Sequence, residues 1–339
     1  MAQIRIDKLQ GAQGVDAFLA LAAEVYRDRP WYVAAQRDWI ETQLTGETPV
    51  SAYAEVQAFL ATLDGKPVAR VLAMHDYDTR EGHLCHFDAL PGSMEAVREL
   101  MDEACQWLDM RGARLARLAF RPGWDTPLTI DAYDARPTLS HRCNPAYYHA
   151  LLANCRFTAS RRMVEYQATF TPDLLERYRS AASGAKLRPF NFNRAARETH
   201  LFRSMINECF ADHWGAPIHS VEEIEGWTTG LADLLFPNAI LFAEVDNEPA
   251  GYVFSMPDLN TNPVTRGCLF DIGVLPEFRK RGIARALASA SFLAMHEAGY
   301  REASYTLVLD DNWASRRTAE SLGCEVARNF LCYERAFAD

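Results

Sequence analysis

Residues 270–287 read FDIGVLPEFRKRGIARAL, and this stretch decides how the whole chain is interpreted. The apolar run that ends at Val274 is typical of a buried strand. The periodic residues of Ile283–Glu297, followed by Gly299, predict a helix with a glycine stop. Between the two lies a short loop, Arg279-Lys280-Arg281-Gly282. The sequence therefore predicts a strand, a basic glycine loop and a helix in direct succession.

A loop of this kind suits an anion. The first turn of a helix leaves backbone N–H groups without partners, and the helix dipole favours negative charge there. Gly282 has no Cβ and Ala284 is small, so a pyrophosphate can approach the backbone closely. A bulky residue at position 282 should cost ligand affinity and little stability, provided that Gly282 has ordinary helical dihedrals.

An internal repeat sets the fold. Residues 59–76 and 241–258 align without gaps, and six of their eighteen positions are identical. Each copy predicts a hairpin around Asp64-Gly65 or Asp246-Asn247. The correspondence continues to Phe87-Asp88 and Phe270-Asp271. Each half then has a further helix and strand, at 94–110 and 114–120 in the first copy and at 283–297 and 303–309 in the second.

The repeat predicts an α+β fold of two superposable tandem domains, each a mixed, mainly antiparallel sheet flanked by helices. The small and polar residues 180–186 are typical of a linker, which gives predicted domains at 1–179 and 187–339. At the place of the basic loop, the first copy has Met94 to Glu99, with two carboxylates and no glycine in the turn. We expect this degenerate copy to reject an anion.

Composition narrows the class of protein. The net charge of −10 argues against nucleic acid as the main partner. No apolar run reaches membrane-spanning length, and the N-terminus lacks the apolar region of a signal peptide. The eight cysteines form no C-x-x-C pair, which favours reduced thiols, and we expect a cytoplasmic protein with no metal site.

Two motifs together resemble those of the GCN5-related N-acetyltransferases, the GNAT superfamily. Residues 270–287 resemble the family's motif A. Asn312-Trp313-Ala314-Ser315, followed by Gly323-Cys324, resembles its N-x-x-[AS]-x₇-G-F signature, with Cys324 in place of Phe. The tandem arrangement resembles two-domain members in which one half keeps the cofactor loop.

The resemblance implies acetyl-CoA, or another acyl-CoA, as co-substrate. In the family, the loop amides hold the pyrophosphate, the end of the preceding strand pairs with the pantetheine arm, and the Asn lies near the reactive end. Carried over, the expected cofactor-binding residues are Val274, Leu275, Arg279, Lys280, Arg281, Gly282, Ile283, Ala284, Asn312 and Ser315.

The family's usual acid and base are missing from this sequence. In many members, a Tyr seven residues after the motif Asn acts as the general acid, and this chain has Ala319 at that position. The usual base positions hold Phe270 and Cys268, and neither side chain is a good base.

Three other residues are candidates for catalysis. His213 ends the first helix of the second copy, although a lone His is more often structural. Asp271 lies on the motif strand, where strict alternation points it away from the Phe270 face unless a bulge intervenes, and its counterpart Asp88 suggests a structural role. Asp258 begins a loop beside the expected acceptor cleft, for which turn formation is the other interpretation.

These observations predict an N-acyltransferase that moves an acetyl or other acyl group from coenzyme A to a small-molecule amine. The acceptor would bind between the two halves. A non-catalytic acyl-CoA sensor or scaffold is an alternative, favoured by the missing Tyr and base. An aminoacyl-tRNA-dependent transferase is another, which the acidic balance disfavours.

Overall fold

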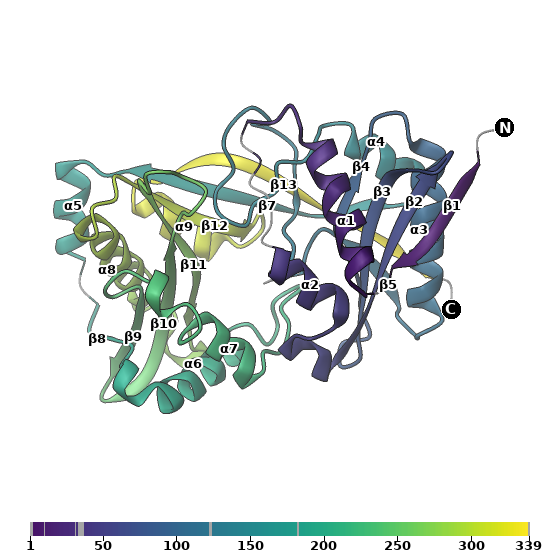
Figure 1. Ribbon diagram of the computed structural model, residues 1–339. Coiled ribbons are helices and arrows are strands. Elements are labelled where there is room, and N and C mark those ends of the chain that lie inside the picture. The colour runs from purple at the N-terminus through teal and green to yellow at the C-terminus, as the bar shows by residue number, and fades with distance from the viewer. Residues whose placement is uncertain are drawn as a thin grey trace. The chain divides into compact units, whose positions relative to one another are not determined.

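The computed structural model describes residues 3–9, 11–30, 32, 37–121, 124–181 and 183–337 (Figure 1). The two halves of the chain share one order of helices and strands, as the repeat predicts. Among the helices in these ranges, none combines the length and the apolar character that a membrane span requires.

The first half contains seven strands and four α-helices in the described ranges. They are β1 (Ile4–Leu9), α1 (Gly11–Val25), α2 (Arg37–Thr45), β2 (Ala54–Leu63), β3 (Lys66–Asp76), β4 (Gly82–Ala89), α3 (Met94–Asp109), β5 (Leu115–Leu118), β6 (Leu128–Thr129), α4 (Tyr148–Asn154) and β7 (Thr158–Thr169).

The helix α5 (Pro172–Arg179) leads into the second half, which repeats this order. Its elements are β8 (Lys186–Pro189), α6 (Ala195–Cys209), α7 (Val221–Trp227), β9 (Ile240–Val245), β10 (Glu248–Pro257), β11 (Arg266–Val274), α8 (Ile283–Glu297), β12 (Glu302–Leu309), α9 (Trp313–Ser321) and β13 (Glu325–Ala336).

Residue conformation explains why the two hairpins form where the sequence predicts them. Asp64 and Gly65 both have positive φ, at 50° and 79°, and so do Asp246 and Asn247, at 53° and 67°. Two successive residues with positive φ match the twist of the flanking strands. The hairpins β2–β3 and β9–β10 therefore confirm the predicted turns.

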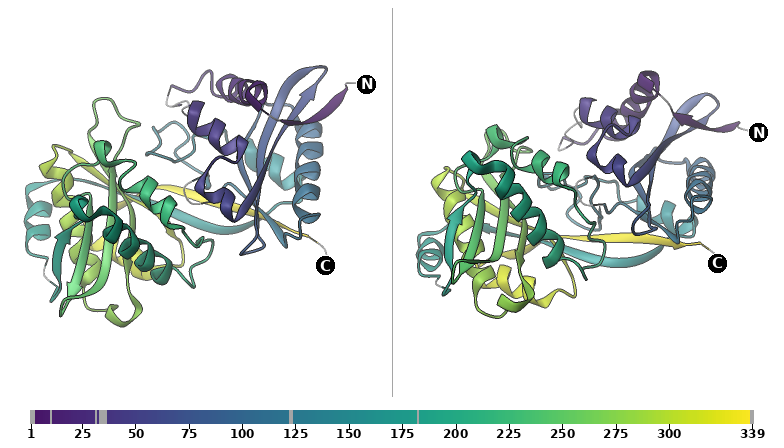
Figure 2. Two further views of the ribbon diagram at one scale, coloured as in Figure 1. Left: turned by 60° about the horizontal axis from the view of Figure 1, so that its bottom comes forward. Right: turned by 90° about the horizontal axis from the view of Figure 1, so that it is seen from below.

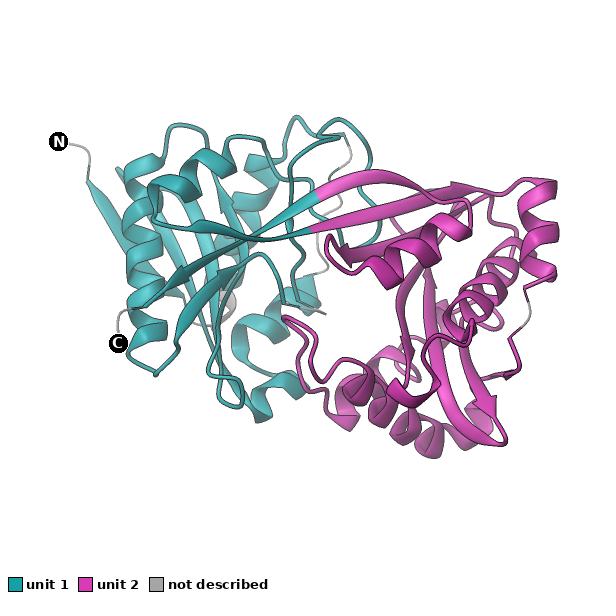
Figure 3. Cartoon of the chain, turned by 180° about the vertical axis from the view of Figure 1, so that it is seen from behind, with its two compact units in different colours: residues 1–162, 330–339 teal, residues 163–329 magenta. Residues whose placement is uncertain are grey.

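The chain forms two compact units that exchange their last strands (Figure 3). Unit 1 is Met1–Arg162 with Phe330–Asp339, and unit 2 is Met163–Asn329. Unit 1 has the strand order β1-β2-β3-β4-β5-β13, and unit 2 has β8-β9-β10-β11-β12-β7. The long strands β7 (teal) and β13 (yellow) are neighbours in the sheet (Figure 2). Each unit thus completes its sheet with the final strand of the other half.

This exchange separates the compact units from the repeats. The ranges 1–179 and 187–339 follow the repeated sequence and stay a prediction about domains. The mixed, mainly antiparallel sheet with flanking helices confirms the predicted fold class, because in each unit one parallel pair, β4–β5 or β11–β12, joins otherwise antiparallel neighbours.

Helices cover both faces of the unit 2 sheet. On one face, α8 buries Leu287, Phe292 and Met295. On the other face, Phe202 of α6 packs against the rings of Tyr252 and Phe254 in β10, at centroid distances of 4.9 and 6.1 Å. The core therefore fixes β10 and β11 between two helical layers.

Candidate acyl-transfer site

The parallel pair of unit 2 opens halfway along β11. Strands β11 and β12 pair from Arg266–Glu302 to Leu269–Tyr305. Beyond Leu269 the register ends, and only the Thr306 hydroxyl still reaches the Leu269 carbonyl oxygen, at 3.3 Å. From Phe270 to Val274, no strand of the described chain pairs with the β12 side of β11. The result is an open, hydrogen-bonding strand edge.

The basic loop follows this edge and has a special backbone. Lys280 and Gly282 have φ of 64° and 76°, which is the left-handed region. Gly282 is the N-cap of α8, and the first helical bond runs from the Ala286 N–H to the Gly282 carbonyl oxygen, at 3.1 Å. The preceding N–H groups, from residue 281 to 285, have no acceptor within the part of the chain that the structure describes. Alternating left- and right-handed residues aim successive N–H groups into a concavity that binds anions.

The expectation of ordinary helical dihedrals at Gly282 is wrong. With φ of 76°, any side chain at this position would strain the backbone. A Cβ there would nevertheless meet open space, since the nearest other heavy atom is the Ser183 Cβ, at 4.0 Å. The glycine is therefore required by its conformation, and the space in front of it is free for a ligand.

Two of the three basic side chains are engaged with the protein's own backbone. Arg279 donates to the carbonyl oxygens of Val274 and Cys209, both at 3.1 Å. Arg281 donates to the Glu277 carbonyl oxygen at 3.0 Å. They brace the loop, whereas the Lys280 side chain is exposed beside it. Of the other predicted cofactor residues, Leu275 and Ile283 are buried and Ala284 is half-buried.

The two cofactor residues predicted near the reactive end lie together at the start of α9. The Asn312 side chain caps this helix by accepting from the Ser315 N–H at 3.2 Å. The Ser315 hydroxyl lies 3.0 Å from that of Tyr305, the last residue of β12 that pairs with β11. Ala319, at the position of the family's usual Tyr, is fully buried. The described contacts thus give Asn312 and Ser315 structural partners at the mouth of the strand opening.

A bulge changes the direction of Asp271. The register between β10 and β11 shifts where Phe254 pairs with Asp271 and Ser255 pairs with Leu269, so Phe270 is the extra residue. Asp271 consequently shares one face of the sheet with Phe254, the face that α6 covers. The sequence analysis allowed for a bulge that would change the direction of Asp271, and this bulge is present.

Within the described ranges, no Lys or Arg side chain forms an ion pair with the Asp271 carboxyl. Burial raises its pKa to about 7, and the Tyr252 hydroxyl beside it counteracts part of that rise. The hydroxyl of Tyr252 is itself buried and has no hydrogen-bond partner of normal geometry in the described chain. Burial, and then the nearby Asp271 charge, raises the pKa of the Cys209 thiol to about 12. Asp271 is therefore a carboxyl that can exchange a proton near neutral pH.

The other two catalytic candidates have different surroundings. His213 is half-buried, burial lowers its pKa, and its ring meets Phe210 edge-on at 5.2 Å. Asp258 is completely buried and pairs with Arg266 through contacts of 2.6 and 2.7 Å. Its carboxylate also accepts from the Asn260 N–H at 3.1 Å, and this local contact supports the turn-forming interpretation.

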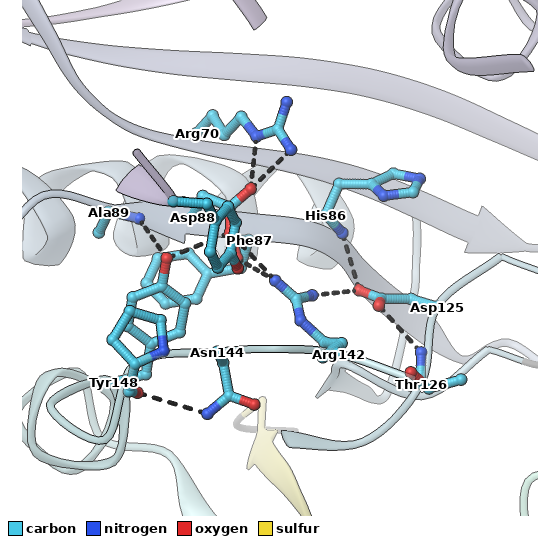
Figure 4. Close-up of polar contacts among 12 residues, drawn as sticks. Arg70, His86, Phe87, Asp88, Ala89, Asp125, Thr126, Arg142, Asn144 and Tyr148 are labelled. Carbon is cyan, nitrogen blue, oxygen red and sulfur yellow. Dashed lines mark hydrogen bonds and ion pairs between the residues drawn. The ribbon is translucent and has the colours of Figure 1, made fainter. Parts of the chain in front are cut away.

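In the first half, the same strand edge is filled by the chain itself (Figure 4). The parallel pairing of β4 and β5 ends at Leu84–Leu118. Beyond it, side chains from residues 125–148 bind the backbone of β4. The Asp125 carboxylate accepts from the His86 N–H at 2.8 Å, Arg142 donates to the Phe87 carbonyl oxygen, and the Tyr147 and Tyr148 hydroxyls bind the Ala89 carbonyl oxygen and N–H at 2.6 and 2.9 Å.

Asp88, the counterpart of Asp271, is locked into this network. Arg70 donates to one of its oxygens at 2.6 and 2.9 Å. The other oxygen accepts from Tyr26 at 2.6 Å, Tyr148 at 3.1 Å and Arg142 at 3.3 Å. Since every lone pair has a partner, this carboxylate is structural.

Sequence reasoning missed Tyr252. In the ungapped repeat it stands where the first half has Arg70, the residue that holds Asp88. The available signal was this replacement of an arginine by a tyrosine between apolar neighbours that match in both copies. Asp125 and Arg142, which help to fill the first opening, gave no such sequence signal, because they lie between regular elements in a segment without periodicity. Among the described residues, no three His, Cys, Asp or Glu side chains are grouped to hold a metal ion.

Comparisons with known proteins agree with this geometry. Residues 200–324 match the Acetyltransferase (GNAT) family. A curated relative, the bacterial ceramide synthase of Caulobacter vibrioides, is 24% identical, with 94% of each chain covered.

Solved structures show the same fold. A tandem GNAT protein from the clavulanic acid biosynthesis pathway superposes with a TM-score of 0.61 at 13% identity, covering 99% of this chain and 100% of that one. A GCN5-related glucosamine N-acetyltransferase region of a fungal multi-domain beta-N-acetylglucosaminidase superposes with a TM-score of 0.66 at 14% identity. That match covers 99% of this chain but 38% of the fungal one.

Proposed function

We propose that this chain, a member of the GNAT superfamily with the tandem two-domain architecture, transfers an acyl group from coenzyme A to an amine. One observation carries the proposal. In unit 2 the strand opening and the loop amides have no partner within the described residues, whereas the equivalent opening in unit 1 is filled by the chain's own side chains.

The loop amides supply the site for the pyrophosphate. The N–H groups of residues 281 to 285 and the dipole of α8 favour an anion, and Lys280 adds an exposed positive charge. Arg279 and Arg281 act indirectly, since they hold the loop in place through backbone carbonyl oxygens. The free edge of β11 from Phe270 to Val274 offers backbone groups to the extended pantetheine arm.

Asp271 is the proposed general base. An alkyl amine has a pKa near 10 and must lose a proton to become nucleophilic. The amine nitrogen attacks the thioester carbonyl carbon, the carbon–sulfur bond breaks, and the amine proton passes to Asp271, directly or through water. The departing thiolate of coenzyme A then takes up one proton, from protonated Asp271 or from water, so the products are an amide and the free thiol. A carboxyl whose pKa is about 7 can accept this proton near neutral pH.

The family resemblance favours an acetyl group and a small amine. A second version, with a long acyl chain and a lipid-like amine, is favoured by the likeness over 94% of both chains to a protein named bacterial ceramide synthase. Both versions use the same bond changes, so they differ only in the two substrates.

Two measurements test the proposal. Calorimetry with coenzyme A should give one site per chain, and two equivalent sites would contradict the filled opening of unit 1. Thiol release and product mass should then be followed with acetyl-CoA and long-chain acyl-CoA against short amines and long-chain amino alcohols. Binding of coenzyme A without thiol release from any pair would favour the sensor or scaffold instead.

A further inference from the structure

We infer that Tyr252 is the positioning residue that keeps the Asp271 carboxyl oriented and without a cation, and that it thereby makes the second half reactive. The inference rests on the proposed function, in which Asp271 takes the amine proton. It assigns a role to a residue that belongs to neither of the two family motifs.

The register of the sheet places the two side chains together. Tyr252 pairs with Gly273 and Phe254 pairs with Asp271, so all four positions share one face of β10 and β11. A Cβ on Gly273 would lie 2.6 Å from the Tyr252 ring and 2.8 Å from the Cys209 sulfur. The glycine therefore leaves room for the Tyr252 ring to lie flat across β11, next to Asp271.

The Tyr252 hydroxyl is a donor without a competing use. It is buried, and within the described chain no acceptor lies at hydrogen-bond geometry from it. A buried unpaired donor is costly, and the adjacent Asp271 carboxylate is the group that can receive it. This pairing would strengthen when Asp271 is charged and weaken when it holds the proton, which orients the carboxylate for its task.

Of the described residues, Tyr252 of β10 and Cys209 of α6 lie on the Asp271 face of the sheet, and Tyr305 of β12 is near enough for the Asp271 charge to raise its pKa slightly. All three side chains are neutral near pH 7, and burial raises the pKa of each further. Arg279, the nearest basic residue named in this region, is bound to backbone carbonyl oxygens. Tyr252 is thus the group whose removal should change Asp271 most directly.

The repeat supplies the contrasting case. Arg70 stands at the position of Tyr252 and forms an ion pair with Asp88, the counterpart of Asp271. An arginine at this position gives a carboxylate that stays charged and held, whereas a tyrosine gives one that can titrate. The difference of one side chain separates a structural carboxylate from a reactive one.

The test titrates the carboxyl itself, so that it does not depend on turnover. Carbon-13-labelled aspartate, with the signal assigned through Asp271→Asn, should titrate near pH 7 in the wild-type protein. Tyr252→Phe should move this midpoint upward, and Tyr252→Arg should move it well below neutral. The matched control is Tyr178→Phe, which removes another buried hydroxyl, bound to the Leu322 carbonyl oxygen at 2.6 Å, and should leave the midpoint in place.

Kinetics then separate the two proposals. If acyl transfer is observed, the rising limb of kcat against pH should follow the same midpoint in Tyr252→Phe, and Tyr252→Arg should lose roughly 10²-fold or more in kcat. An unchanged Asp271 midpoint in folded Tyr252→Phe overturns the role of Tyr252 even if the enzyme is active. Absence of turnover with a shifted midpoint overturns the proposed function and leaves the positioning role standing.

Discussion

Asp88 and Asp271 occupy corresponding places in the two halves of the chain, yet their surroundings are opposite. Asp88 is bound by two arginines and two tyrosines, beside a strand edge that the chain itself has filled. Asp271 has no cation partner among the described residues, and it lies next to an edge with which none of the described strands pairs. The comparison shows how one scaffold can hold two different carboxyls, because ion pairing keeps a carboxylate charged and desolvation without pairing raises its pKa.

The largest effect should come from removing the free carboxyl. Asp271→Asn should lower kcat by roughly 10²–10⁴-fold, because the amide cannot take the amine proton. Affinity for coenzyme A, measured by calorimetry, should stay unchanged, since the loop amides are untouched. If the Asp271→Asn protein were fully active, Asp271 would not be the general base, and His213 would be the next candidate.

The same substitution in the first half should act on stability. Asp88→Asn leaves Arg70 buried without its carboxylate, whereas Arg142 keeps Asp125 at 2.7 Å, and breaking a buried pair in this way costs about 3–5 kcal/mol. Urea unfolding would measure the loss, and coenzyme A affinity in the folded fraction is the control. If Asp88→Asn were neutral for stability, the contrast between a structural and a reactive carboxylate would fail.

The loop glycine can be tested with a control in the same helix. Gly282 and Gly299 bracket α8, have φ of 76° and 92°, and both face open space. A valine at either position should destabilise the fold by about 1–2 kcal/mol through left-handed strain. Only Gly282→Val should also weaken coenzyme A binding, by about 1–3 kcal/mol for a lost phosphate hydrogen bond. Equal affinity in the two variants would sink the proposed phosphate site.

Stability should depend on pH through Asp271. Its folded-state pKa of about 7 lies above the ordinary value of an aspartate, so the folded protein binds the proton more tightly than the unfolded chain does. Stability from this group is therefore greatest in acid and is lost as the pH rises through about 7. Unfolding of wild type and Asp271→Asn between pH 5 and pH 8 should show the variant gaining relative stability toward the higher pH.

The smallest effect is expected for His213. Its ring packs against Phe210 and its lowered pKa keeps it neutral, so His213→Ala should change kcat by less than about tenfold if Asp271 is the base. A loss of 10²-fold or more, with coenzyme A affinity intact, would instead make His213 the group that deprotonates or orients the acceptor.

The sequence by itself determined the repeat, the hairpins and the loop at Arg279–Gly282, because each rests on local rules. Alternation of apolar residues, residues that accept positive φ in tight turns, and the glycine after α8 act within a few positions of the chain. The sequence also predicted that the first copy is degenerate, since its loop at residues 94–99 lacks the glycine and carries two carboxylates.

The tertiary structure alone decided the exchange of the last strands and the different surroundings of Asp88 and Asp271. Strand β13 is the final strand of the second half, but it pairs with β5 of unit 1. This pairing depends on contacts between residues far apart in the sequence. The bulge at Phe270 turned Asp271 to the face of Tyr252, and Arg142 reached back more than fifty residues to Asp88. A pKa depends on burial and on the charges that folding brings near, so no local pattern could separate two aspartates that follow the same Phe in both copies.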